Sequence, residues 1–110
     1  MKYRHLGNSG LEVSVIGLGT NNFGGRMEFK EARAVIFSAL DQGINLIDTA
    51  NIYSHGRSEE IIGRALTDRR QESLIATKFG MVWEDGPHGH GGSRKHIMDS
   101  LEGSLRRLQT

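Results

Sequence analysis

The sequence contains no cysteine and a single proline among its 110 residues. Without cysteine the chain can form neither disulfides nor thiolate metal sites, which fits a cytoplasmic protein. No apolar run approaches the roughly 20 residues that a membrane-spanning helix needs, and the opening MKYRHLGNSG lacks the apolar stretch of a secretory signal. The net charge is +1, so the composition shows no electrostatic footprint for nucleic acid. We therefore expect one soluble globular domain over residues 1–110.

Fifteen glycines mark the turns between regularly spaced elements. YRHL (3–6) and LEVS (11–14) flank the turn-forming GNSG and predict a hairpin. The apolar segments 15–19, 44–48 and 73–79 predict buried strands, and a helical pattern follows each of them. The strand starts recur about every 29 residues, which is the length of a strand–helix unit with parallel strands.

The three helical patterns carry their own start and stop signals. Residues 28–43 place apolar side chains along one helix face, and Gly43 is positioned to end that helix in a left-handed conformation. Ser58 is expected to cap a second helix from Glu59, whose carboxylate suits the positive end of the helix dipole. Ser93 is expected to cap a third helix, along which apolar residues recur at Ile97, Leu101, Leu105 and Leu108.

Parallel strand–helix units fit two architectures, a doubly wound open sheet and a (β/α)8 barrel. A barrel needs roughly 250 residues, so this chain would supply an N-terminal hairpin and about three of the eight units. We therefore expect an α/β fold that is incomplete, and a longer parent protein. Three strands with two open edges predict marginal stability in isolation.

Charged residues end two neighbouring strands, Asp48 the second and Lys78 the third. Parallel neighbours lie about 4.8 Å apart, and the pleat places Asp48 on the face of Leu46 and Lys78 on that of Ala76. The two side chains can therefore pair at the carboxyl edge of the sheet, where active sites of barrels lie. Tyr53, in the loop after Asp48, can fold back over the pair.

The cluster of Asp48, Tyr53 and Lys78 is suited to proton donation. A phenol is a poor acid at neutral pH, because its pKa lies near 10. An ammonium group close by favours the phenolate, and a carboxylate can hold that ammonium in place. The same residues also fit a plainer interpretation, a structural salt bridge beside a loop tyrosine.

The segment GLGTNNFGG (17–25) matches a dinucleotide fingerprint only in part. Asn22 stands where the third glycine of G-x-G-x-x-G belongs, so the Rossmann motif fails. We interpret the segment as a glycine-rich loop that leaves Thr20 and Asn21 free to contact a ligand.

The histidines and the tryptophan give weaker signals. His88 and His90 offer two ligands where a zinc site has three or four, so no metal site is predicted. His55 and His96 are expected in loops or at the surface. Trp83 fits a wall of a substrate pocket and a residue that packs its loop down equally well.

The segments GLGT, GINLIDTANIYSHGRSEEIIGRAL and LIATKFG together resemble the aldo-keto reductase superfamily. SRKHIMDSLEGSLRRLQT is similar to its branch of bacterial aldo-keto reductases and potassium-channel beta subunits. The resemblance covers essentially the whole chain, and its D-T-A-x-x-Y block with a following T-K is specific. It implies a (β/α)8 TIM barrel whose bottom is covered by the hairpin, with residues 1–110 as the N-terminal part.

The resemblance also implies roles for individual residues. Tyr53 would be the general acid that protonates a carbonyl oxygen, Lys78 would tune its acidity, and Asp48 would pair with Lys78. The hydride would come from NADPH, beside which the family places Gly19, Thr20, Asn21, Arg26 and Asp48. Asn21 replaces a tryptophan common in the family, and Arg26 a glutamine of the channel subunits.

The family's fourth catalytic residue, a histidine, would follow Thr110, so these residues alone are not expected to turn over substrate. Three functions stay open. The parent would be an NADPH-dependent carbonyl reductase acting on a small-molecule carbonyl substrate, or an NADPH-binding regulatory subunit of the channel beta-subunit type. The third possibility is that residues 1–110 are a structural or non-catalytic fragment. Neither nucleic acid nor a membrane is expected as a partner, and assembly with further copies of the chain stays open.

Overall fold

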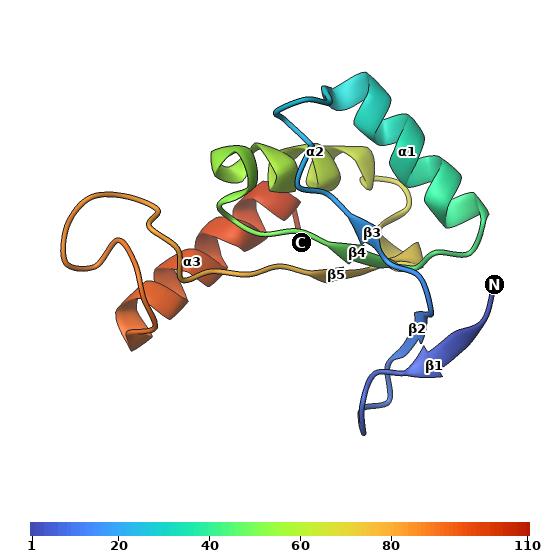
Figure 1. Ribbon diagram of the computed structural model, residues 1–110, viewed down its shortest axis with the longest axis horizontal. Helices are drawn as coiled ribbons and strands as arrows, with labels where there is room; N and C mark the ends of the chain where they lie inside the picture. Colours follow the sequence, from blue (N-terminus) through green and yellow to red (C-terminus); the bar gives the residue numbers. More distant parts are fainter.

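The computed structural model describes all 110 residues, which form a hairpin followed by three strand–helix units (Figure 1). The hairpin strands β1 (Tyr3–His5) and β2 (Glu12–Ser14) are antiparallel. This confirms the hairpin that the sequence predicts. The hairpin projects from the amino end of the main sheet, and the Tyr3 hydroxyl ties it there by donating to the Gly43 carbonyl at 2.9 Å.

Three short parallel strands make the main sheet, in the order β3 (Leu18–Gly19), β4 (Leu46–Asp48) and β5 (Leu74–Ala76). The register places Asp48 between Gly19 and Ala76. The first strand is shorter than the predicted segment 15–19. Val15 and Ile16 are 47% and 57% exposed, because they form the connection from the hairpin rather than part of the ladder.

The helices are α1 (Phe29–Asp41), α2 (Arg57–Ala65) and α3 (Arg94–Leu108), with short 3₁₀ turns η1 (Tyr53–Gly56) and η2 (Arg70–Glu72). Helix α1 follows its predicted apolar face, and Gly43 beyond its end has a left-handed φ of +84°. At α3, the Ser93 hydroxyl accepts from the His96 amide at 3.1 Å, which confirms the predicted cap.

Both crossover helices α1 and α2 cover the same face of the sheet (Figure 1). The strands contribute Ile47, which is 1% exposed, to the core on this side. The remaining members of the buried cluster are Phe23, Ala32, Ile36, Leu40, Ile61, Ile62, Ala65, Leu66 and Leu108. A doubly wound sheet carries helices on both faces, whereas a barrel keeps its helices outside and the opposite face inside. The winding is therefore that of a partial (β/α)8 barrel.

Two predictions about side-chain placement were wrong. Ser58 does not cap α2, because Gly56, with φ of +89°, starts the helix earlier and turns Ser58 into the interior, where it is fully buried. His96 is not at the surface but 3% exposed on α3, with its Nε2 3.4 Å from Ser100 Oγ. None of the helices is long and apolar enough to cross a lipid bilayer.

Helix α3 turns small and polar side chains inward. The residues it buries are His96, Ser100, Gly103, Ser104 and Leu108. Of the apolar stripe along the helix only Leu108 is buried, while Ile97, Leu101 and Leu105 are 38%, 49% and 41% exposed. The stripe correctly marks a helix, but this chain does not cover it.

Candidate active site

Asp48 and Lys78 pair on the face of the sheet that carries no helix. Lys78 Nζ lies 2.8 Å from Asp48 Oδ1 and donates to the Thr49 carbonyl at 2.6 Å. The backbone around Lys78 is also fixed, because the Asn51 amide donates to the Lys78 carbonyl at 3.0 Å, just beyond the end of the β4–β5 ladder. Both the side chain and the backbone of Lys78 are therefore held in place at the carboxyl edge of the sheet.

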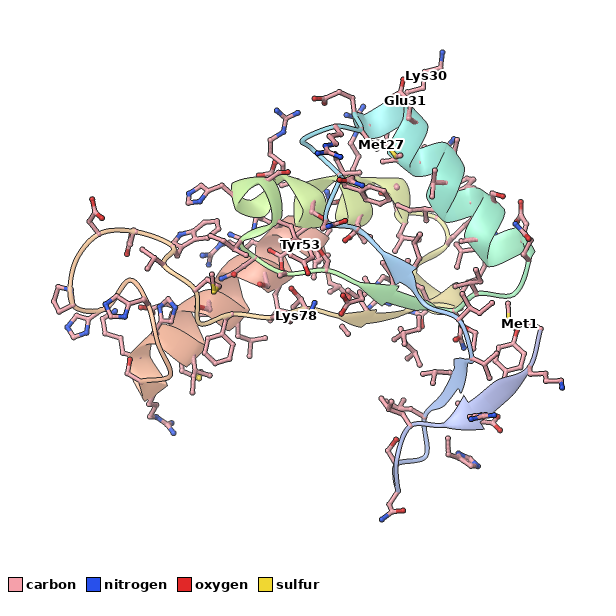
Figure 2. The ribbon with its side chains drawn as sticks, in the orientation of Figure 1. Met1, Met27, Lys30, Glu31, Tyr53 and Lys78 are labelled. Atoms are coloured by element: carbon pink, nitrogen blue, oxygen red, sulfur yellow. The ribbon has the colours of Figure 1, made fainter.

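Tyr53 lies near Lys78, on the 3₁₀ turn that follows β4 (Figure 2). Lys78 Nζ is 5.2 Å from the centroid of the Tyr53 ring. The next two residues, Ser54 and His55, both have φ of +50°, which non-glycine residues rarely adopt. This reversal turns the chain sharply from Tyr53 into α2 and keeps the phenol over the strand ends.

A mostly apolar cavity of about 310 Å³ opens next to Tyr53 and Lys78. Its walls are Ala50, Asn51, Ile52, Tyr53, Lys78, Phe79 and Met81. The loops after β4 and β5 supply these residues, so the cavity lies at the carboxyl edge of the strands, where ligands bind in this architecture. An apolar cavity bordered by one phenol and one ammonium suits a small molecule with a single polar group.

A buried hydroxyl network lies beneath the pair, on the helix side. Ser58 Oγ lies 2.9 Å from Thr49 Oγ1, 3.0 Å from Thr20 Oγ1 and 3.1 Å from the Thr20 carbonyl. Thr20 Oγ1 in turn donates to the Asp48 carbonyl at 2.9 Å. The expectation that Thr20 is free to contact a ligand was wrong for its hydroxyl. The residue is 1% exposed, and its hydroxyl is hydrogen-bonded within this network.

The neighbouring Glu59 was assigned by sequence reasoning only to the helix dipole. Its side chain is fully buried, accepts from Thr77 Oγ1 at 2.6 Å and accepts from Arg107 Nε on α3 at 2.7 Å. The signal that could have found this layer is a threonine directly after each strand, in the segments LGT, LIDT and LIAT. Ser58 and Glu59 contact all three of these threonines.

The other residues predicted beside a cofactor lie at the surface. Gly19 is paired with Asp48, and a Cβ built on it would meet nothing within 4 Å, so open space adjoins the ion pair there. Asn21 and Arg26 are exposed on the loop between β3 and α1. The structure brings Gly19 close to Asp48, and the cofactor contacts of Asn21 and Arg26 stay predictions.

Trp83 packs the loop after β5 against the rest of the molecule. Its ring stacks on His55 with centroids 4.0 Å apart, and the Arg107 guanidinium lies 4.7 Å from the ring centroid. The base of the loop is closed by the Gly91 amide, which donates to the Gly80 carbonyl at 3.0 Å. This geometry favours the packing interpretation of Trp83, which is absent from the walls of the cavity beside Tyr53.

Comparison with known protein families gives a match over most of the chain. The model described as "Aldo/keto reductase family" matches residues 15–110. A rice (Oryza sativa subsp. japonica) protein named "Probable voltage-gated potassium channel subunit beta" is 43% identical over 113 aligned positions, covering 98% of this chain and 34% of the relative. "Aldo-keto reductase YhdN" of Bacillus subtilis (strain 168) is 41% identical, covering 100% of this chain and 35% of the relative.

Solved structures agree with this match. The "aldo-keto reductase AKR11C1 from Bacillus halodurans (holo form)" superposes with a TM-score of 0.88 at 41% identity, covering 100% of this chain and 37% of that one. A structure described as the "putative aldo-keto reductase from Pseudomona aeruginosa" PA4992 superposes with a TM-score of 0.85 at 43% identity, covering 98% and 42%. The chain thus spans about a third of the length of the curated relatives it matches.

Proposed function

The chain belongs to the aldo/keto reductase family, and from this premise we propose that the protein reduces aldehydes and ketones to alcohols with NADPH. The observation that carries the proposal is the position of the Lys78 ammonium. It lies 2.8 Å from Asp48 Oδ1 and 5.2 Å from the centroid of the Tyr53 ring. In this arrangement the phenol can donate a proton, and the carboxylate holds the positively charged ammonium beside it.

Tyr53 gives its proton to the carbonyl oxygen of the substrate. The phenolate that remains carries a negative charge, and the ammonium of Lys78 favours that charge electrostatically. Asp48 and the Thr49 carbonyl hold the ammonium, so that little reorganisation is needed as charge develops. The apolar walls of the adjoining cavity hold the carbon skeleton of the substrate.

The residues present fit a nicotinamide nucleotide. The open space over Gly19 lets a flat ring approach the backbone beside Asp48, where a side chain would intrude. The exposed guanidinium of Arg26 and the exposed amide of Asn21, on the loop that follows, offer donors for phosphate or sugar oxygens. When bound, NADPH supplies the hydride that reduces the carbonyl carbon.

A second candidate is a regulatory subunit that binds NADPH without turnover. It is supported by the rice relative and by an Arabidopsis thaliana relative, 41% identical, which carries the same channel-subunit name. Asp48, Tyr53 and Lys78 are compatible with both functions. Turnover therefore decides between them.

The test is the oxidation of NADPH by the purified full-length protein in the presence of small aldehydes, with the Tyr53→Phe variant alongside. The variant keeps the ring but loses the proton, so we expect kcat to fall by roughly 10²–10⁴-fold while NADPH affinity stays nearly unchanged. Tyr3→Phe is the matched control, because Tyr3 lies in the hairpin and its hydroxyl donates to the Gly43 carbonyl at the amino end of the sheet, opposite the edge that carries Tyr53.

Unchanged turnover in Tyr53→Phe would remove the phenol from the role of acid. Tight NADPH binding with background turnover in the wild-type protein would favour the regulatory subunit instead.

A further inference from the structure

Glu59 is a fully buried carboxylate that joins three elements of the fold. It lies in the first turn of α2, accepts from Thr77 Oγ1 just beyond β5, and accepts from Arg107 Nε of α3. Burying a charge is unfavourable unless it is paired and hydrogen-bonded, and here both conditions hold. A site of this kind specifies one arrangement of its partners, because any displacement leaves a buried oxygen unsatisfied.

Thr77 connects this buried carboxylate to the candidate active site. Successive residues of an extended chain point to opposite faces of the sheet. The Thr77 hydroxyl therefore reaches Glu59 on the helix side, while the next side chain, Lys78, reaches Asp48 on the open face. The strand end that carries Lys78 is thus held from both of its faces.

Arg107 is itself held tightly in place. Its guanidinium lies 4.7 Å from the centroid of the Trp83 ring, and its side chain is only 18% exposed. Gly56 and Gly103 leave the room it needs, because a Cβ on Gly56 would lie 2.8 Å from Arg107 Cδ and one on Gly103 would lie 3.1 Å from an Arg107 η nitrogen. Because Arg107 is held in place, its hydrogen bond also holds the Glu59 carboxylate in place. The Glu59 carboxylate in turn holds the Thr77 hydroxyl.

From this chain of contacts we infer that Glu59 is a positioning residue for the reaction, which sets the place of Lys78 relative to Asp48 and Tyr53 through Thr77. The inference rests on the proposed carbonyl reduction. Glu59 does not reach the open face of the sheet, so its effect is on geometry. An error of about 1 Å in the placement of a catalytic group costs on the order of a hundredfold in rate.

Thr77→Val in the full-length protein tests the inference. Valine keeps the shape of threonine but removes the hydroxyl, and the Glu59–Arg107 ion pair stays in place. We expect kcat to fall by roughly ten- to a hundredfold with little change in the KM for the aldehyde or in the Kd for NADPH. Thr77→Ser, which restores the hydroxyl, should restore kcat.

Ser14→Ala is the control for a general loss of stability. Its hydroxyl is also buried and donates to the Ile16 carbonyl at 2.6 Å, but it lies where the hairpin meets the amino end of the sheet, away from Lys78. We expect this variant to melt at a lower temperature with unchanged kcat. If Thr77→Val does not fold, Thr77→Ala takes its place, with the same loss of kcat expected.

The proposed reduction and the positioning role of Glu59 are overturned by different results. A wild-type protein without turnover overturns the proposed reduction and this inference with it. Wild-type turnover together with an unchanged kcat in folded Thr77→Val leaves the proposed reduction standing and overturns the positioning role of Glu59. A low kcat in Thr77→Ser as well would also overturn it, because the hydroxyl would then not be the group that matters.

Discussion

At the scale of single residues, Gly63 decides how closely α2 and α3 approach. A Cβ at this position would lie 2.5 Å from the Arg107 carbonyl oxygen and 2.7 Å from the Leu108 carbonyl carbon. Both contacts are backbone atoms, which cannot move aside as the end of a flexible side chain can. Glycine is therefore required inside α2 even though it is a poor helix former.

We predict that Gly63→Ala lowers the free energy of unfolding by about 1–3 kcal/mol, because overpacking outweighs the gain in helix propensity. Urea denaturation of the full-length protein measures the change. Gly92→Ala is the control, since a Cβ there meets nothing within 4 Å. A Gly63→Ala protein as stable as wild type would show that α3 can shift away from α2 without loss.

Residue by residue, the sequence predicts the polar groups at strand ends better than those inside the fold. Asp48 and Lys78 follow from the strand ends and the pleat, and the structure places them 2.8 Å apart. Ser58 was assigned to the wrong role, because a serine before glutamates matches a helix cap and the left-handed Gly56 is visible only in the backbone. Buried polar contacts depend on which elements pack together, which local pattern does not encode.

At the scale of elements, α3 carries a surface ion pair that responds to pH. Lys95 Nζ donates to Asp99 Oδ2 at 2.6 Å, and this hydrogen bond lowers the pKa of Asp99 below its usual value of 3.8. A carboxyl with a lowered folded-state pKa stabilises the fold above the unfolded-state pKa. That contribution is lost as the pH falls below about 3.8 and through the folded-state pKa.

We predict that Asp99→Asn lowers the melting temperature slightly at neutral pH. The difference from wild type should shrink as the pH falls below about 3.8 and disappear once the pH is below the lowered folded-state pKa of Asp99. Melting curves across this range provide the measurement. Asp85→Asn, on the exposed loop after β5, should match wild type throughout. A difference between Asp99→Asn and wild type that persists in acid would have a cause other than the ion pair.

The apolar stripe of α3 shows that a sequence pattern can predict a helix without predicting which of its faces is buried. Isoleucine and leucine at helical spacing correctly predict the helix, but Ile97, Leu101 and Leu105 remain 38%, 49% and 41% exposed. Between His96 and Leu108 the buried side is made of the small residues Ser100, Gly103 and Ser104. Periodicity identifies a helix, while the choice of buried face depends on what is available to cover it.

At the scale of the whole molecule, these residues expose more surface than a compact domain does. Their accessible area of 6949 Å² exceeds the roughly 6,100 Å² expected for a monomer of 12.2 kDa. The excess is in keeping with the open inner face of the sheet and the uncovered stripe of α3.

The spacing of strands and helices in the sequence could not distinguish a barrel from a doubly wound sheet, because the strands of both are apolar throughout. The resemblance named the barrel, and the placement of α1 and α2 agrees with it.

We predict that residues 1–110 produced on their own melt over a broad temperature range and bind an apolar dye, because the uncovered surface is hydrophobic. Circular dichroism and dye fluorescence are the measurements. Leu101→Glu, at an exposed position of α3, should reduce dye binding while keeping the helical signal. A sharp, concentration-independent melt without dye binding would show that this part of the barrel is stable by itself.

The closed base of the loop after β5 has a practical consequence for engineering. Its two ends meet where the Gly91 amide donates to the Gly80 carbonyl at 3.0 Å, so the segment leaves and re-enters the body at nearly one point. Residues 84–88 lie beyond the bond from the Trp83 amide to the Gly89 carbonyl, at 2.9 Å, and can therefore be exchanged as a cassette of different length and composition. Trp83 then keeps its contacts with His55 and Arg107. Selection for new substrates could then vary this cassette while the strands and the first turn of α2 are left unchanged.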